Sequence, residues 1–326
     1  MRQRDEGRTV GRLLTIGETM GVAVTEVGDP LRTARGLRLS TAGAESTVAI
    51  GLSRLGHEAV WVGVVGEDEL GARVLRDLAA EGVDTRFVRT EPDHQTGFMI
   101  RELRSAEYTH VTYFRRHSAG SRLAPADVES ALSANPDLDL VHLTGITPAL
   151  SQSCAEAVGR TVELAQAARV PISFDVNYRS TLPGSAATAA FVKELLPEID
   201  LLFVGDDELA LIAEEEDTER AARDLLARGP AEVVVKQGSK GALAAADDGR
   251  LVTHPALQVR VLDVIGAGDS FTAGYLAARF DGLAPRERLR WGTIAAACTV
   301  GTHGDWEGLP TRADLRQRGA GSVTIR

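Results

Sequence analysis

The sequence predicts an α/β fold, in which a doubly wound, mostly parallel sheet is flanked by helices and carries a small β lid. Short apolar runs with the length of buried strands alternate with segments whose apolar residues recur at helical spacing. The chain has 326 residues, of which 44% are hydrophobic and 25% charged, as expected of a globular enzyme. Two stretches, about 20–42 and 97–116, break the alternation. The second is rich in Tyr, Phe, Thr and Val, and we expect both to supply the strands of the lid.

The alternating elements follow one another along the chain. A helix is predicted at 45–55, a strand at 60–65 and a helix at 70–81, and Gly56 and Gly82 mark the two helix ends. Beyond the second lid segment, strands are predicted at 138–143, 170–176, 201–204 and 232–236, with helices at 154–168, 187–196, 208–214 and 219–228. A hairpin around 247–249 and helices at 270–280, 285–297 and 312–318 complete the prediction.

The predicted domain organisation is simple. We expect one domain over residues 13–318, a disordered N-terminal tail at 1–12 and a C-terminal tail at 319–326. The first residues are polar and lack the apolar segment of a secretory signal, and no apolar run approaches the roughly 18 residues of a membrane span. Cys154 and Cys298 are the only cysteines, and both lie in apolar helical patterns. These features predict a cytoplasmic protein without a membrane partner.

The charge balance limits the possible partners. Thirty-six basic and 46 acidic residues give a formal net charge of −10, which opposes attraction to nucleic acid. A small anionic substrate must then be attracted locally, by clustered arginines or by glycine-rich turns with free backbone amides. The seven histidines are scattered without metal-ligand spacing, so we expect neither zinc nor iron to be bound.

The run Gly266-Ala267-Gly268-Asp269 has the strongest chemical signal. Val259 and Val261 alternate before it and predict a strand, whereas helical spacing follows it, so the glycines are predicted to lie at a helix N-terminus. Backbone amides there lack intrahelical partners and bind anions.

Two interpretations of this run are open. A carboxylate beside an anion site repels a phosphate, which favours Asp269 as the base that accepts a proton from an attacking hydroxyl. Alternatively, Asp269 only caps the helix and the glycines form a tight turn.

At this point the sequence resembles the PfkB (ribokinase-like) carbohydrate kinase family. Residues 263–274 are similar to that family's C-terminal signature, and residues 42–56 are similar to its N-terminal one. The resemblance spans about residues 14–315. It implies that ATP, carrying Mg²⁺, binds near the second signature, that Asp269 deprotonates a sugar hydroxyl, and that the adjacent run, Gly266, Ala267 and Gly268, shares the catalytic site.

The resemblance also implies which residues contact the nucleotide. These are Asn177, Lys236, Gly238, Lys240, Gly241, Gly266, Gly268 and Thr293, and Glu208 acts indirectly on magnesium. By composition alone, the stretch 235–241 is equally well explained as an exposed basic turn. The sequence departs from the family pattern at four positions: Ala42 replaces a glycine, Thr47 and Gly205 replace asparagines, and Thr293 stands where an adenine-side Asn is common.

Further segments resemble the 2-keto-3-deoxygluconate kinase branch of the family. Residues 113–121, 143–150, 175–179 and 304–308 carry this resemblance, although Met99 stands where the branch has a tyrosine. It implies that the substrate is contacted by Gly43, Tyr113, Arg115, Arg179 and Asp305. A guanidinium can pair with a carboxylate through two parallel hydrogen bonds, which suits a sugar acid. Alternatively, Arg115 and Arg116 are a surface pair on a lid strand.

The sequence therefore predicts an ATP-dependent kinase that converts a sugar acid, 2-keto-3-deoxygluconate, to its 6-phosphate. A neutral-sugar kinase such as a fructokinase, and a catalytically silent ligand-binding protein on the same fold, are the alternatives. Exposed strands of the lid also predict a homo-oligomer.

Overall fold

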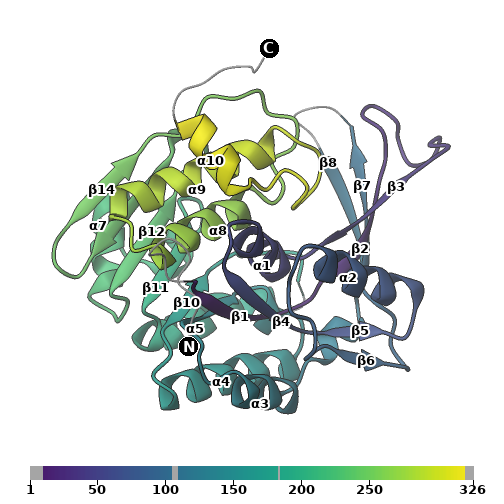
Figure 1. Ribbon diagram of the computed structural model, residues 1–326, viewed down its shortest axis with the longest axis horizontal. Helices are drawn as coiled ribbons and strands as arrows, with labels where there is room; N and C mark the ends of the chain where they lie inside the picture. Colours follow the sequence, from purple (N-terminus) through teal and green to yellow (C-terminus); the bar gives the residue numbers. More distant parts are fainter. Residues whose placement is uncertain (1–9, 105–108, 183, 320–326) are drawn as a thin grey trace.

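The central element of the computed structural model, which describes residues 10–104, 109–182 and 184–319, is an eight-stranded sheet (Figure 1). Its strand order is β14-β13-β12-β11-β10-β9-β1-β4. The strands are β1 (Arg12–Ile16), β4 (Glu58–Val62), β9 (Leu140–Thr144), β10 (Ile172–Asp175), β11 (Leu201–Gly205), β12 (Glu232–Lys236), β13 (Ala242–Ala246) and β14 (Leu251–His254). From β12 to β4 all pairs are parallel, and β13 and β14 form the predicted antiparallel hairpin.

Helices cover both faces of this sheet. Consecutive residues of a strand point to opposite faces, and both sets are apolar here, so both faces must be buried. In β1, Leu13 belongs to the core formed with α1 (Ala44–Arg54), α8 (Ala267–Phe280), α9 (Pro285–Val300) and α10 (Arg312–Gly319). Leu14 packs into the core formed with α3 (Pro125–Ala134), α4 (Gln152–Ala167), α5 (Ser185–Leu195), α6 (Leu209–Ile212) and α7 (Thr218–Leu226). The predicted α/β fold class is confirmed.

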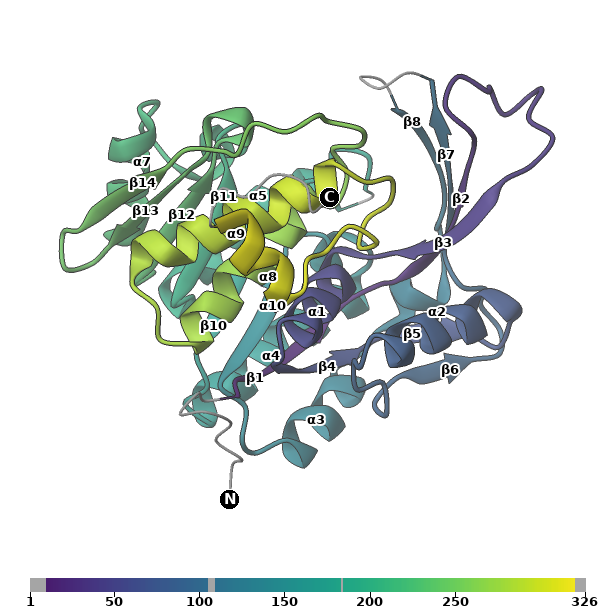
Figure 2. The same cartoon turned by 45° about the horizontal axis from the view of Figure 1, so that its top comes forward.

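A second sheet stands apart from the main body (Figure 2). It has the order β3-β2-β7-β8 and consists of β2 (Met20–Val24), β3 (Arg38–Ala42), β7 (Phe98–Leu103) and β8 (Thr109–Phe114). One face carries its own small core, which includes Met20, Met99 and Leu103. These strands come from the two segments that break the alternation in the sequence. We call this sheet the lid sheet.

The structure differs from the prediction at several places. No strand forms around Val259 and Val261; instead, the amides of Leu262 and Asp263 donate to the carbonyl of Val300 at the end of α9. Val261 is 45% exposed, so its alternation with Val259 does not mark a buried face. The strand predicted at 60–65 is divided into β4 and β5 (Val64–Gly66), and β5 pairs with β6 (Arg89–Glu91).

The predicted tails fall largely outside the described residues, which exclude 1–9 and 320–326. The tail boundary at residue 12 is corrected, because Arg12 begins β1 and its amide donates to Asp139. Strand β1 and helix α3 were not predicted. Helix α2 (Glu69–Ala80) agrees with the prediction to within one residue.

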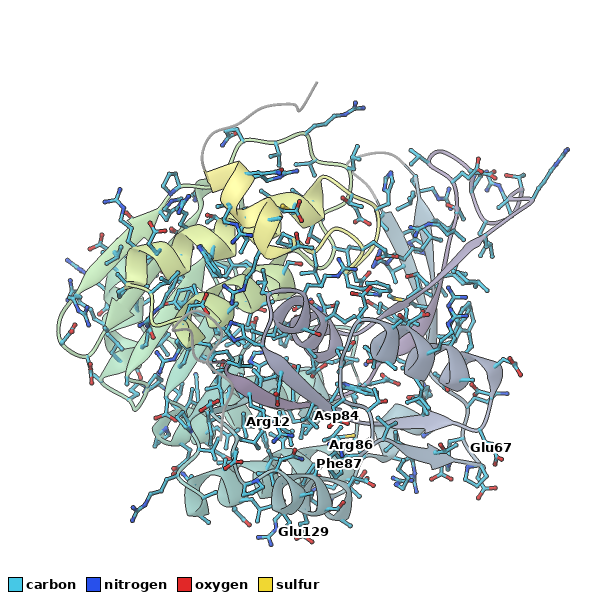
Figure 3. The ribbon with its side chains drawn as sticks, in the orientation of Figure 1. Arg12, Glu67, Asp84, Arg86, Phe87 and Glu129 are labelled. Carbon is cyan, nitrogen blue, oxygen red and sulfur yellow. The ribbon has the colours of Figure 1, made fainter. Side chains whose placement is uncertain are left out.

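The β4 edge of the main sheet is covered by the segment that follows α2. Asp84 exchanges backbone hydrogen bonds with β4, since its amide donates to Ala59 and its carbonyl accepts from Trp61. Its side chain pairs with Arg86 at 2.7 Å, and the Arg86 guanidinium lies over the Phe87 ring (Figure 3). The edge backbone groups are therefore occupied locally. Within the described ranges, no helix is both long enough and apolar enough to cross a membrane.

Candidate active site

A cavity of about 770 Å³ lies between the lid sheet and the carboxyl ends of the parallel strands. Ligands of open α/β sheets bind at this edge, where strand ends and loops converge. The cavity brings together twelve of the predicted site residues: Gly43, Tyr113, Arg115, Asn177, Arg179, Glu208, Lys236, Gly238, Gly266, Gly268, Asp269 and Asp305. Residues more than 200 positions apart in the sequence thus share one site.

The glycine-rich run forms the N-terminus of α8, as predicted. Gly266 is in the left-handed region with φ of 77°, and a Cβ there would lie 2.2 Å from the carbonyl oxygen of Asp305. Only glycine fits this turn. A Cβ on Gly268 would instead meet only the Lys236 ammonium, at 3.4 Å. The first-turn amides of α8 therefore adjoin an open part of the cavity, where an anion can approach them.

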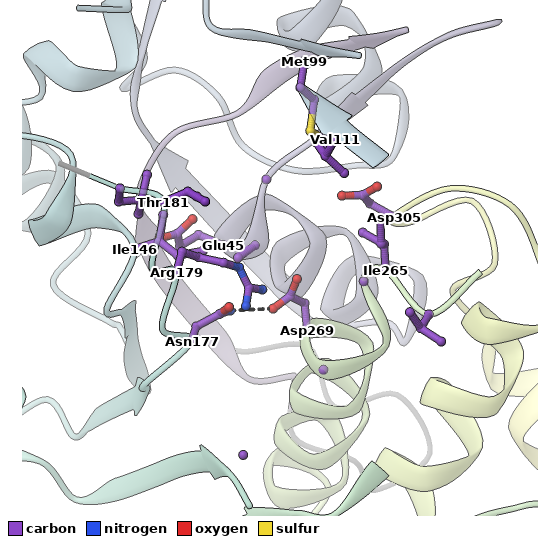
Figure 4. Close-up of a pocket in the computed structure, with 18 of the residues that line it drawn as sticks. Glu45, Met99, Val111, Ile146, Asn177, Arg179, Thr181, Ile265, Asp269 and Asp305 are labelled. Atoms are coloured by element: carbon purple, nitrogen blue, oxygen red, sulfur yellow. Dashed lines mark hydrogen bonds between the residues drawn. The ribbon is translucent and has the colours of Figure 1, made fainter. Parts of the chain in front are cut away.

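Asp269 lies in the first turn of α8 and faces the cavity (Figure 4). Its Oδ1 accepts a hydrogen bond of 2.9 Å from Nδ2 of Asn177. Burial raises the pKa of Asp269, and the nearby Asp175 carboxylate raises it further, whereas Arg179 and Lys236 oppose the shift. A raised pKa makes the carboxylate a better proton acceptor than an exposed aspartate.

Lys236, at the end of β12, is bound to a carboxylate that was not among the predicted site residues. Its Nζ lies 2.8 and 2.6 Å from the two carboxylate oxygens of Asp175, and Thr272 also donates to Asp175. Burial alone would lower the pKa of Lys236, but the charges of Asp175 and Glu208 outweigh it and raise the pKa. Lys236 therefore carries a fixed positive charge at the edge of the anion site.

Glu208 lies behind this lysine. Its two oxygens accept hydrogen bonds from the amides of Tyr178 and Gly205, at 2.6 and 2.7 Å. Burial raises its pKa. Both oxygens thus hold two loops of the cavity in place. Within the described ranges, no cluster of three or more His, Cys, Asp or Glu residues could hold a metal.

A second buried carboxyl group, Glu45, also lines the cavity and was missed in the sequence. It lies in the first turn of α1 with 1% exposure, and its Oε1 accepts hydrogen bonds of 2.6 Å from Thr144 and Thr147. Burial raises its pKa. The position of Glu45 inside the N-terminal signature could have indicated a site residue, but the sequence alone does not distinguish this role from that of an acidic residue at a helix start.

The predicted substrate arginines differ in their surroundings. The Nε of Arg115 donates to Glu18 at 2.8 Å, and its Nη2 pairs with the same carboxylate. Glu18 is 3% exposed and also accepts from the Ser118 hydroxyl. One edge of the Arg115 fork is therefore occupied by the protein. Arg179 is exposed, and its side chain points between Glu45 and Asp269 (Figure 4).

The lid sheet contributes the opposite wall. Met99, Val111 and Tyr113 line the cavity together with Arg101, which the sequence did not single out. Met99 and Val111 lie on the side of the cavity that faces Asp305 (Figure 4). Arg101 pairs with Asp305 and with Asp263. Met99, at the position of the branch tyrosine, makes this part of the wall apolar.

Four predicted residues do not line the cavity in the described part of the chain: Ala267, Lys240, Gly241 and Thr293. The Thr293 hydroxyl donates to the Arg290 carbonyl within α9. Gly241 has φ of 111°, and a Cβ there would lie 2.0 Å from the His254 carbonyl oxygen, so this glycine serves the turn before β13. Lys240 is exposed on the same turn.

Thr47, which replaces the asparagine of the N-terminal signature, also lies away from the cavity surface. It is fully buried in α1. Gly205, the other replaced asparagine, does line the cavity, at the end of β11.

Comparison with known proteins identifies the family of the chain. Residues 11–312 match the model of the pfkB family carbohydrate kinases. The chain is 33% identical over 304 residues to a 2-dehydro-3-deoxygluconokinase from Bacillus subtilis, covering 93% of each chain. It is also 33% identical to a 2-dehydro-3-deoxygalactonokinase from Haloferax volcanii, over 90% of this chain and 92% of the relative.

A solved structure agrees as well. The PfkB protein from Polaromonas sp. JS666 superposes with a TM-score of 0.84 at 32% identity, covering 94% of this chain and 99% of the other. The sequence match extends over both signatures and over the lid sheet, and the structural match covers nearly the whole chain. The chain belongs to the pfkB family of carbohydrate kinases.

Proposed function

We propose that this kinase transfers the γ-phosphoryl group of ATP to the 6-hydroxyl of a sugar acid, 2-keto-3-deoxygluconate. The observation that carries the proposal is the cavity shared by Asp269, the glycines at the start of α8 and two arginines, Arg115 and Arg179. It joins a proton acceptor, an anion site and a carboxylate-binding charge. The names of the relatives that are 33% identical to the chain support the same substrate class.

The nucleotide side of the cavity fits the phosphates of Mg-ATP. Lys236, Gly238, Gly266 and Gly268 line it, and the missing side chain at Gly268 leaves room for a phosphate beside the α8 amides. Bound Mg-ATP supplies the phosphoryl group and neutralises its charge. Magnesium keeps several waters and is usually held through substrate phosphates, which suits a site where Glu208 only braces the surrounding loops.

Asp269 accepts the proton of the attacking hydroxyl, whose oxygen forms the new bond to the γ-phosphorus of ATP while the bond from that phosphorus to the β-phosphate oxygen breaks and ADP leaves. The hydrogen bond from Asn177 holds the carboxylate in one orientation, and its raised pKa strengthens it as a base. The α8 amides and Lys236 face the negative charge that develops on the transferred group. Both transfers therefore take place at the oxygen of the sugar hydroxyl, which loses its proton to Asp269 and gains the phosphoryl group.

On the sugar side, Arg179 and the free edge of Arg115 attract the substrate carboxylate. Gly43, Tyr113 and Asp305 contact the hydroxyl groups. The apolar surface of Met99 and Val111 suits a sugar with a deoxygenated carbon, since a methylene needs no hydrogen-bond partner.

The occupied edge of Arg115 favours one alternative, a neutral-sugar kinase. Glu18 offsets the charge of Arg115, so the net attraction for a carboxylate rests more heavily on Arg179. A hexose such as fructose would then bind through Glu18, Asp305 and the backbone around Gly43.

An ATP-consumption assay with a panel of acceptors tests the proposal. The panel contains 2-keto-3-deoxygluconate, its C-4 epimer 2-keto-3-deoxygalactonate, fructose and ribose. We expect kcat/KM to be highest for one of the two sugar acids. Equal or higher kcat/KM for fructose establishes the neutral-sugar alternative, and no ATP consumption with any acceptor supports a silent ligand-binding protein.

We further propose that the protein works in the cytoplasm as a homo-oligomer. Its use of ATP and its two free, buried cysteines suit a reducing compartment. The outer face of the lid sheet exposes Phe114 by 56% and Leu39 by 48%, and the Phe98 ring lies 6.2 Å from Phe114. Light scattering coupled to gel filtration is expected to give a multiple of the chain mass, and Phe114→Asp is expected to lower it.

A further inference from the structure

Arg101 is a charged lid residue that lies inside the protein. It projects from β7 and is 1% exposed, yet it borders the cavity. Its Nη1 lies 3.3 Å from Oδ2 of Asp263, and its Nη2 pairs with Oδ1 of Asp305. One guanidinium thus neutralises two carboxylates, whose side chains are 1% and 13% exposed. Burying three charged groups costs desolvation free energy, so an arrangement of this kind suggests that it serves to fix a particular geometry.

Asp263 connects this contact to the catalytic run. Its carboxylate accepts from the amide of Ile265 at 3.1 Å and from the amide of Gly304 at 3.4 Å. The Asp305 backbone carbonyl packs directly against Gly266, at the start of α8. The loops at 263–266 and 304–307 are therefore held together, and Arg101 is the lid residue that touches both of them.

The 304–307 loop has a second attachment to the lid sheet, at β3. The indole Nε1 of Trp306 donates to the Thr41 carbonyl at 3.0 Å, and Ser40 donates to Glu307 at 2.6 Å. Asp305 lies between this attachment and Arg101. Asp305 is the residue of this loop that lines the cavity, and its carboxylate is the group that Arg101 contacts.

We propose that Arg101 is a positioning residue that orients Asp305 toward the sugar and couples the lid sheet to the anion site at α8. The inference rests on the proposed function, because it assigns Asp305 to sugar contact. Arg101 acts through Asp305: when β7 lies against the 304–307 loop, one Asp305 oxygen is fixed by the guanidinium and the other is free to accept a sugar hydroxyl.

The kinetic test uses Arg101→Lys, which keeps the charge but cannot reach both carboxylates with a planar fork. We expect KM for the sugar acid to rise about tenfold, while kcat and KM for ATP change less than about threefold. Arg104→Lys is the matched control, because Arg104 follows β7 directly but its side chain is 40% exposed and, among the described residues, pairs with Glu102 rather than with the 304–307 loop. It is expected to behave as the wild type.

A double-mutant cycle distinguishes action through Asp305 from general loss of structure. Asp305→Asn alone is expected to raise KM for the sugar acid, and adding Arg101→Lys is expected to raise it no more than about twofold further. Multiplicative effects, or an unchanged KM in Arg101→Lys, overturn the proposal. Arg101→Met is measured in the same way. If this variant does not fold, the Arg101→Lys variant and its combination with Asp305→Asn decide the outcome.

A measurement without turnover separates this inference from the proposed function. Hydrogen exchange of the peptide that spans 304–307 is expected to be faster in Arg101→Lys than in the wild type and unchanged in Arg104→Lys. Unchanged exchange in Arg101→Lys refutes the coupling even if the enzyme phosphorylates the sugar acid. Faster exchange with no activity of the wild type on any acceptor upholds the coupling and refutes the proposed function.

Discussion

Asp269 combines three features that bear on its role. It lies at a helix N-terminus, it is held by Asn177, and burial raises its pKa. A helix cap needs only the first of these. A base needs an orientation and an affinity for the proton, which the other two provide. The structure therefore favours the base over the helix cap, and substitution of this one carboxylate distinguishes them.

The first prediction is that Asp269→Asn lowers kcat by at least about a hundredfold and leaves substrate KM nearly unchanged. The amide keeps the size of the side chain and can still accept the hydrogen bond from Asn177, but it cannot take up a proton. Steady-state kinetics of the purified variant measure the effect, with Asp93→Asn at an exposed position as the control. A near-normal kcat would remove Asp269 from the chemistry.

The second prediction concerns the stability of the same variant. A raised pKa means that the folded state disfavours the ionised Asp269, so the wild type loses stability as the pH rises from the unfolded pKa to the raised folded pKa, and the full penalty remains at higher pH. Below the unfolded value of about 3.9 both states are protonated and the penalty is absent. We expect Asp269→Asn to raise Tm at pH 8, with a gain that shrinks as pH falls through the raised pKa. A gain that is independent of pH contradicts this account.

At the scale of the element, the first turn of α8 contains two glycines with different roles. Gly266 is required by its left-handed backbone and by the Asp305 carbonyl. Gly268 has no such constraint, because a Cβ there would meet only the flexible end of Lys236. The first glycine therefore serves the fold, and the second leaves space for a ligand.

The third prediction follows from this difference. Gly268→Val is expected to fold with a Tm close to that of the wild type but to lose detectable turnover, because its methyl groups would fill the phosphate position. Gly266→Ala is expected to destabilise the protein, by about 1–2 kcal/mol from the left-handed backbone alone. Thermal unfolding and kinetics of both variants check it. An active Gly268→Val shows that the α8 amides do not bind the phosphate.

Across the whole molecule, the site lies between two bodies that fold around different cores. The main sheet supplies Lys236 and, through α8, Asp269, while the lid sheet supplies Tyr113 and the segment beyond it supplies Arg115. In the proposed reaction, the sugar must contact both the main body and the lid side of the cavity. We expect phosphate binding to depend on the main body and sugar specificity to depend on both bodies, because Tyr113 and Arg115 lie on the lid side of the cavity whereas Arg179 and Asp305 belong to loops of the main body.

The fourth prediction tests this division. Arg115→Lys keeps a charge near Glu18 but loses the fork, and we expect KM for 2-keto-3-deoxygluconate to rise more than KM for any neutral sugar. Each charged hydrogen bond contributes roughly 1.5–3 kcal/mol, so one lost bond corresponds to about one to two powers of ten in kcat/KM. KM for ATP is the internal control. Equal weakening of acidic and neutral sugars would favour the neutral-sugar alternative.

The sequence by itself determined most of the main elements, with β1 and α3 as exceptions, the two segments of the lid sheet and the position of Asp269 at a helix start. Local periodicity and the positions of glycines predict these features, because both patterns depend on only a few neighbouring residues. Where a local pattern had no neighbour to pair with, the prediction was wrong. Val259 and Val261 alternate like a strand, but their segment bonds to the end of α9.

Only the tertiary structure decided which charges pair inside the cavity. Arg115 binds Glu18 across 97 positions of sequence, Lys236 binds Asp175 across 61, and Arg101 binds Asp263 across 162. No local pattern specifies such partners, because ion pairing depends on distances that exist only after the sheet and the lid have been assembled. The sequence therefore named twelve of the residues that line the site, and the fold determined which of their charges remain available to a substrate.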